Sequence, residues 1–140
     1  MWVTSGAYAA TCPPLEGTYD CKAGNARLGP VKNFEEVTEI TATVTPDTQS
    51  QFQFPDMDYA IIPDGKTRKF QEHDMHLGDL HIALTASCAG NRLTRKMVVW
   101  EINLVDSTVL KMTGPTLEIT QTITQLGRAY RRNSVCTKRP

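Results

Sequence analysis

The sequence predicts an all-β domain: an antiparallel up-and-down meander of eight or nine strands, closed into a barrel and held by two disulfides. Three observations support this fold class. Apolar and polar residues alternate with a period of two along several segments, turn residues recur about every 8–12 positions, and the chain contains four cysteines. No stretch of twelve residues shows the apolar stripe of an amphipathic helix. Short strands at this spacing are typical of a barrel or sandwich, and closure removes the exposed edges of a meander.

The composition is that of one globular domain. The chain has 140 residues, of which 40% are hydrophobic and 21% charged, which excludes a disordered tail. Its 15 basic and 15 acidic residues cancel, which argues against a nucleic-acid-binding protein. No apolar run approaches the roughly 18 residues of a transmembrane helix. We expect residues 10–140 to form a single β-barrel domain, and the sequence carries no signal for an oligomeric state.

Threonine marks many of the predicted strands. The chain contains 18 threonines, and β-branched residues fit a pleated, half-buried surface. The clearest strand is 117–126, where Leu117, Ile119 and Ile123 share one face and threonines occupy the other. The same alternation predicts strands at 17–22, 34–44, 51–54, 59–62, 67–70, 80–88, 98–104 and 108–113.

Turn chemistry separates these strands. Pro63-Asp64-Gly65 predicts a hairpin between 59–62 and 67–70. Further turns are predicted at 89–91, 106–107 and 114–115, and segment 71–78 is expected to be a loop or one helical turn. The residues after the last predicted strand read as a basic tail, which is either simply solvated or directed to an anionic surface.

Trp100 is expected to be a core residue. In the predicted strand 98–104 it shares a face with Val98, Ile102 and Leu104. Burial of so large a side chain would dominate the energy of the local core. Its replacement by alanine is then expected to cost roughly 3–5 kcal/mol.

The N-terminus and the cysteines point to export. Ala7-Tyr8-Ala9 fits the small-x-small rule of a signal-peptidase site, so residues 1–9 read as the remnant of a signal peptide. The alternative is an ordinary chain terminus. Disulfides persist in oxidising compartments, so we expect the protein to be periplasmic or extracellular.

The parity of residues around the cysteines predicts one of the three pairings that four cysteines allow. Cys21 shares the inward parity of Tyr19, and Cys88 that of the apolar residues of its strand, so these two thiols would meet beneath one barrel end. Cys12 and Cys136 lie outside the first and last predicted strands, which are neighbours in a closed meander. The predicted disulfides are therefore Cys21–Cys88 and Cys12–Cys136.

The first strand carries a family resemblance. Leu15-Glu-Gly17-Thr-Tyr19 is similar to the G-x-W motif that opens the first strand of lipocalins and the wider calycin group, with Tyr19 in the tryptophan position. The resemblance implies a barrel whose aromatic plug is covered by an arginine after the last strand, here Arg128, Arg131 or Arg132. The run from Cys12 to Cys21 also resembles the opening of small uncharacterised exported bacterial β-barrel proteins.

Few residues point to metal binding or catalysis. The three histidines His73, His76 and His81 lie within nine residues together with several carboxylates, a composition that suits zinc or copper as well as a plain polar loop. The plain loop is the favoured interpretation, so we expect no metal and no cofactor. No serine lies in a G-x-S-x-G or S-x-x-K motif and no glycine-rich phosphate loop occurs, so we expect no enzyme activity.

The expected function is binding. An eight-stranded barrel holds either a filled core or one small ligand. The first hypothesis is a lipocalin-like carrier of a small apolar ligand, with a pocket lined by Trp100, Met112, Tyr59 and Phe52. The second is a module that binds an exported protein partner, such as a hydrolase inhibitor, through segment 71–78. A hollow barrel would favour the carrier, and a filled barrel with a protruding loop would favour the inhibitor.

Overall fold

The fold is a single antiparallel sheet of nine strands. The computed structural model describes residues 12–25, 33–44, 50–55 and 57–140, so the predicted signal-peptide remnant lies outside the described residues. The strands are β1 (Gly17–Asn25), β2 (Asn33–Val44), β3 (Ser50–Gln53), β4 (Arg68–Asp74), β5 (Gly78–Ala89), β6 (Arg92–Val99), β7 (Leu104–Thr113), β8 (Thr116–Gln125) and β9 (Arg128–Lys138). Within the described part, the helical structure is the short 3-10 helix η2 (Trp100–Ile102), and no helix is long and apolar enough to cross a membrane.

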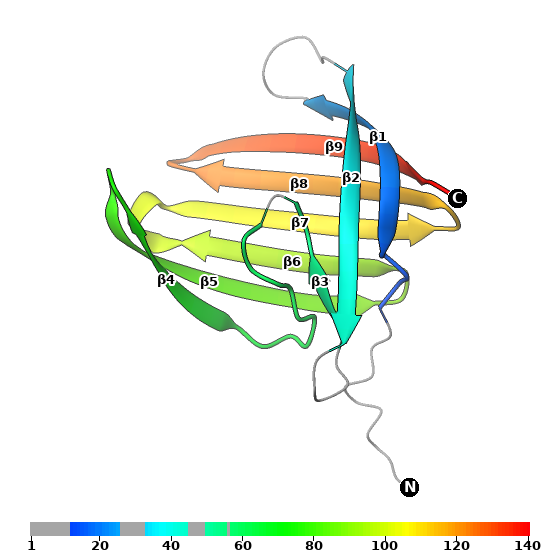
Figure 1. Ribbon diagram of the computed structural model, residues 1–140. Coiled ribbons are helices and arrows are strands. Elements are labelled where there is room, and N and C mark those ends of the chain that lie inside the picture. The colour runs from blue at the N-terminus through cyan, green and yellow to red at the C-terminus, as the bar shows by residue number, and fades with distance from the viewer. Residues whose placement is uncertain (1–11, 26–32, 45–49, 56) are drawn as a thin grey trace, which may run out of the picture.

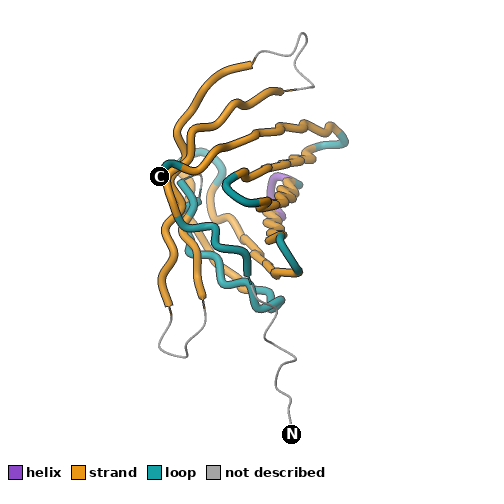
Figure 2. The backbone as a smooth tube through the Cα atoms, turned by 90° about the vertical axis from the view of Figure 1, so that its right-hand side faces the viewer, coloured by secondary structure: helices purple, strands orange, loops and turns teal. Residues whose placement is uncertain are grey.

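The strand order confirms the predicted meander. Neighbours in the sheet follow β3-β2-β1-β9-β8-β7-β6-β5-β4, so consecutive strands pair everywhere except between β3 and β4, and the first strand lies beside the last. Figure 1 shows β1 and β2 crossing steeply in front of the layer formed by β5–β9, and Figure 2 shows the two layers facing each other. The concave side of the sheet therefore encloses the interior.

The sheet is open between its edge strands β3 and β4. The loop 54–67 spans this opening, because an isolated bridge joins Phe52 of β3 to Ile61 and another joins Asp64 to Ser87 of β5. Asp64 also accepts two hydrogen bonds of 2.8 Å from the guanidinium of Arg68. The predicted strand 59–62 and the predicted hairpin at Pro63-Asp64-Gly65 are wrong, since both segments belong to this loop.

One end of the barrel is plugged by the segment that precedes β1. Leu15 and Tyr19 are fully buried, and the Tyr19 hydroxyl donates a hydrogen bond of 2.8 Å to the Leu15 carbonyl. The cation over the tyrosine ring is Lys138, whose Nζ lies 6.0 Å from the ring centroid. Gly17 leaves room for this lysine, because a Cβ at position 17 would lie 2.6 Å from Lys138 Cε. The buried aromatic residue is thus Tyr19, and the cation over it is Lys138, not one of the three arginines that the resemblance implies.

All four cysteines are paired, but the predicted pairing is wrong. The disulfides join Cys12 to Cys88 and Cys21 to Cys136. Cys21 and Cys136 stand directly opposite each other where β1 pairs with β9, and their Cα atoms are 3.9 Å apart. The prediction failed because it placed Cys136 beyond the last strand, whereas this cysteine lies inside β9.

The segment 98–104 contains a chain reversal, not the predicted strand. Strand β6 ends at Val99, residues 100–102 form η2, and Asn103 adopts a left-handed conformation with φ 49° before β7 begins. Trp100 is therefore 53% exposed at the turn, which contradicts its predicted burial. The alternation of apolar residues continues on both sides of the turn, so the pattern gave no sign of the reversal. Asparagine tolerates the left-handed conformation that the turn requires.

Two further boundaries differ from the sequence-based expectation. The C-terminal basic tail is strand β9, and the predicted turn at 106–107 lies inside β7. The segment 71–78 is the end of β4 followed by its turn to β5. The predicted turns at 89–91 and 114–115 are confirmed, with Gly90 at φ 60° and Gly114 at φ 57°.

Candidate ligand-binding cavity

Four neighbouring strands each place one polar side chain at the same level of the interior. The sheet register pairs residues directly across β6, β7, β8 and β9 at this level. The resulting polar row consists of Arg95, Thr108, Gln121 and Arg132. Residues opposite one another share a face of the sheet, so these four side chains meet in one place although they are far apart in sequence.

Apolar residues flank the polar row on the side of the plugged end. One level towards the plug, the register places Leu93, Leu110 and Ile119 together with Ser134. Levels on one face lie two residues, or about 6.8 Å, apart along a strand. The layer between the polar row and the plugged end is therefore mainly apolar.

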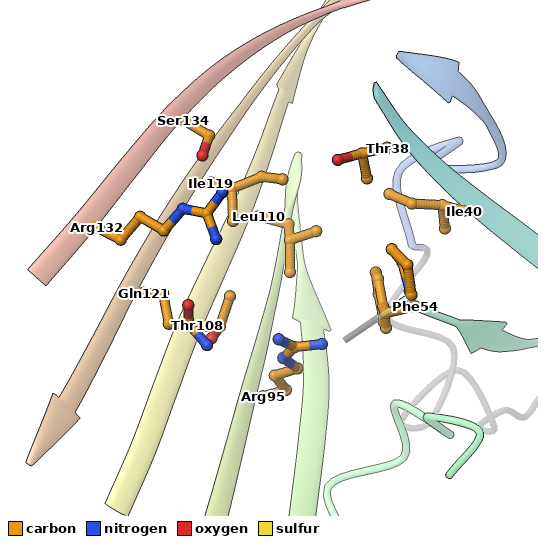
Figure 3. Close-up of a pocket in the computed structure, with 11 residues that line it drawn as sticks. Thr38, Ile40, Phe54, Arg95, Thr108, Leu110, Ile119, Gln121, Arg132 and Ser134 are labelled. Carbon is orange, nitrogen blue, oxygen red and sulfur yellow. The ribbon is translucent and has the colours of Figure 1, made fainter. Parts of the chain in front are cut away.

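A cavity of about 280 Å³, partly open to solvent, lies over this row. The whole polar row lines it, and its apolar wall includes Leu110 and Ile119 of the layer behind and Ile40 and Phe54 of the layer in front. Figure 3 shows the side chains of Arg95 and Arg132 extending into this space from two strands of the same layer, β6 and β9. The cavity thus combines two guanidinium groups with an apolar wall.

The two arginines are placed differently. Arg95 is only 4% exposed, and its guanidinium carbon lies 4.9 Å from the centroid of the Phe54 ring, a cation–π geometry. Arg132 is half-buried on β9. Arginine is rarely buried in proteins because the desolvation of its charge is costly. A guanidinium has five N–H donors, so it can bind a protein group and still donate to a ligand.

Asp106 organises the centre of the polar row. It lies one level further from the plugged end than Thr108, on the same face of β7, and is 9% exposed. One of its carboxylate oxygens accepts a hydrogen bond of 2.9 Å from Thr108 Oγ1, and the other accepts one of 2.9 Å from Gln121 Nε2. Both oxygens of this buried carboxylate are therefore engaged by members of the row.

The four residues predicted to line a pocket lie elsewhere. Trp100 is in η2, Phe52 is buried in β3, and Met112 is buried beside Tyr19, whose hydroxyl lies 3.8 Å from its sulfur. Tyr59 belongs to loop 54–67, where its ring stacks on Phe70 with centroids 4.0 Å apart. None of the four lines the cavity described here.

Tyr59 instead helps to anchor the loop to β4. Its hydroxyl is hydrogen-bonded to Glu72. Burial, followed by the hydrogen bond and the charge of Glu72, raises the pKa of Tyr59 to about 12. The residue therefore stays neutral throughout the physiological range and acts as a structural contact.

The sequence held a signal for the polar row. Arg95 shares the parity of Leu93 and Met97 in β6, and Arg132 shares that of Cys136 in β9, so both are polar residues at inward positions. This parity became visible only once the strand boundaries were known. The interpretation of the C-terminal residues as a basic tail left Arg132 on the surface.

The histidines pair with single carboxylates. His73 Nδ1 lies 3.0 Å from an oxygen of Asp79, and His81 Nδ1 lies 2.6 Å from an oxygen of Glu101. The backbone N–H of His76 donates to Asp74 in the β4–β5 turn. Across the described residues, no three His, Cys, Asp or Glu side chains converge in a way that could hold a metal ion.

Exposed apolar side chains lie in the turns at the end of the sheet opposite the plugged end. Met75 and Leu77 lie in the β4–β5 turn, Trp100 in the β6–β7 turn and Leu126 in the β8–β9 turn, with exposures of 90%, 56%, 53% and 75%. Figure 1 shows these three turns at the same side of the sheet. The segment proposed to bind a protein partner is part of this set.

Comparison with solved structures finds chains of similar fold. No protein-family model and no curated protein sequence matches the chain. The fold is similar to the crystal structure of secretory abundant heat soluble protein 4 from Ramazzottius varieornatus, with a TM-score of 0.53 and 18% sequence identity. The similarity covers 100% of this chain and 99% of that one. At this identity the similarity shows a shared fold and nothing about ligands.

Proposed function

We propose that this chain is an exported protein that binds a small amphipathic anion in the interior of its barrel. The observation that carries the proposal is the pair of guanidinium groups that face a common cavity beside an apolar wall. This proposal refines the expected carrier of a purely apolar ligand by giving the ligand an acidic group.

The chemistry of the polar row favours an anion. Arg95 and Arg132 both line the cavity, and none of the described residues that line it is acidic. Guanidinium groups bind carboxylate, sulfate and phosphate oxygens through paired N–H donors, and such charge-assisted bonds are stronger than neutral ones. A low-dielectric wall strengthens this attraction further.

The remaining cavity wall favours a ligand with a short apolar part. Ile40, Leu110 and Ile119 offer aliphatic surface next to the polar row. The volume of about 280 Å³ lies near the lower end of the range of roughly 300–1,000 Å³ that is usual for small-molecule sites. A medium-chain carboxylate has the required combination of charge and apolar area.

Two disulfides support export, because such bonds persist outside the reducing cytosol. Periplasmic and extracellular locations fit this proposal equally well. The alternative function, binding of an exported protein through segment 71–78, has some support in the exposed side chains of Met75 and Leu77. The cavity favours the carrier, because an inhibitor needs no internal space.

The proposal is tested by calorimetric titration of the purified protein with octanoate and with 1-octanol. We expect octanoate to bind at least tenfold more tightly, since of the two ligands only octanoate offers the guanidinium groups a charged acceptor. Arg95→Met and Arg132→Met should weaken octanoate binding while leaving the weak binding of octanol unchanged.

The matched control is Arg131→Met, because Arg131 is the exposed neighbour of Arg132 on the outer face of β9. This variant should bind octanoate like the wild type. Equal affinity for octanol and octanoate, or equal weakening by all three substitutions, would refute an anion site in the barrel.

A further inference from the structure

We infer that the bound ligand carries a hydroxyl group next to its anionic group, and that Asp106 is the positioning residue that sets this preference through Thr108. The inference rests on the proposed function and narrows its ligand class to small hydroxy acids. It follows from the directions of the hydrogen bonds in the polar row.

The first step concerns the hydrogen of the Thr108 hydroxyl. A carboxylate has only acceptors, so the hydroxyl must be the donor in its 2.9 Å hydrogen bond with Asp106. A hydroxyl has one hydrogen and two lone pairs. Thr108 therefore has no donor left for the cavity that it lines, and it presents an acceptor there.

The second step concerns Gln121. Its Nε2 donates to the other oxygen of Asp106 at 2.9 Å, which turns its carbonyl oxygen away from this carboxylate. The centre of the polar row thus supplies acceptors, whereas its two ends, Arg95 and Arg132, supply only donors. A ligand that matches the row must combine acceptors with a donor.

A simple carboxylate cannot make this match. Its oxygens pair with the guanidinium groups, but it has no hydrogen to offer Thr108, which is 1% exposed. A buried acceptor without a donor is unfavourable, and sites built to bind a hydroxyl discriminate against analogues that lack it. A hydroxyl on the carbon beside the carboxylate supplies the missing donor.

The experiment compares 2-hydroxyoctanoate with octanoate in calorimetric titrations at one pH and ionic strength. The wild type should bind the hydroxy acid about tenfold more tightly, the ratio expected for one additional hydrogen bond in a buried site. Thr108→Val removes the acceptor and should bring the ratio to about one, with octanoate affinity kept or improved.

A second variant separates Asp106 from a merely structural role. Asp106→Leu frees the hydrogens of Thr108 and Gln121, so the hydroxyl can donate to a carboxylate, and octanoate should then bind as tightly as the hydroxy acid. Thr94→Val, on the exposed face of β6, is the control that should keep the wild-type ratio. The circular dichroism and melting temperature of each variant establish that it is folded.

The outcomes distinguish the two proposals. If the wild type binds both acids equally, the hydroxy-acid inference is overturned and the anion site stands. If neither acid binds, the proposed function fails and this inference fails with it. A ratio that survives both Thr108→Val and Asp106→Leu in folded variants would show that Asp106 does not set the preference.

Discussion

Replacing Asp64 with asparagine should destabilise the fold by about 2 kcal/mol near neutral pH and by far less in acid. The side chains of Asp64 and Arg68 are 11% and 32% exposed and form a bidentate pair with both N–O distances at 2.8 Å. This pair holds the loop 54–67, which spans the opening of the sheet and supplies Phe54 and Pro55 to the cavity wall. Its strength therefore bears on the cavity as well as on the fold.

The magnitude follows from the pKa of Asp64. The hydrogen bonds from Arg68, with a further one from the backbone N–H of Lys66, lower this pKa from 3.8 to about 2. Each tenfold difference in proton affinity is equivalent to about 1.4 kcal/mol, which gives about 2 kcal/mol for the carboxylate form. Because the pKa is lowered in the folded state, this stability is present above pH 4 and is lost as the pH falls through 2.

The assay is urea unfolding of the wild type and Asp64→Asn at pH 6 and pH 2. The two curves should be separated at pH 6 and lie much closer at pH 2, where the carboxyl of Asp64 is protonated in the unfolded chain and about half protonated in the folded one, so most of the stabilisation is lost. Asp20→Asn is the matched control, since Asp20 forms an equally bidentate pair with Arg139 at an exposed position, where solvent screening leaves little net stability. An equal loss for Asp64→Asn at both pH values would refute the electrostatic explanation.

Three further predictions concern the covalent framework, the turn and the loop. Peptide mapping without reduction should recover Cys12 linked to Cys88 and Cys21 linked to Cys136, and a peptide linking Cys21 to Cys88 would contradict the strand register. Replacing Cys21 and Cys136 by alanine should lower the free energy of unfolding by about 5 kcal/mol, because it opens a loop of 115 residues. In a Trp2→Phe background, Trp100 should show red-shifted fluorescence that acrylamide quenches readily; a blue-shifted and protected indole would contradict the position of Trp100 in the turn. Trp100→Ala should change the free energy of unfolding by less than about 1 kcal/mol. Tyr59 has a raised pKa of about 12, so its contribution to stability is complete below pH 10 and is lost as the pH rises towards 12. The wild type should therefore be more stable than Tyr59→Phe below pH 10, and this difference should shrink as the pH rises towards 12; a difference that does not change with pH would argue against it.

The strands that the sequence predicted well are those with simple alternation. The predicted segment 117–126 corresponds to β8, because Leu117, Ile119 and Ile123 alternate with threonines on the other face of the strand. Turns marked by Gly90 and Gly114 were also found, since both residues adopt positive φ angles that glycine allows without strain. In these segments local propensity and burial agree.

The candidate site escaped the sequence analysis because its residues reverse the usual pattern. Arg95 and Arg132 are charged residues on the inner face, so alternation assigned the strand around Arg132 to a solvated tail. Trp100 reversed the pattern in the other direction, as a large aromatic residue at an exposed turn. The polar row forms because the register of the sheet pairs its four residues across four strands. No local sequence pattern encodes this register.

The central claim is that a ligand's acidic group lies beside the guanidinium groups of Arg95 and Arg132. Titration of octanoate labelled with ¹³C at its carboxyl carbon, bound to the protein and followed by NMR, tests this claim directly. Two neighbouring cations favour the charged form, so the carboxyl of the bound ligand should titrate at lower pH than that of free octanoate. This difference should shrink in Arg95→Met and Arg132→Met and persist in Arg131→Met. A bound carboxyl that titrates at or above the pH of the free acid would contradict the claim.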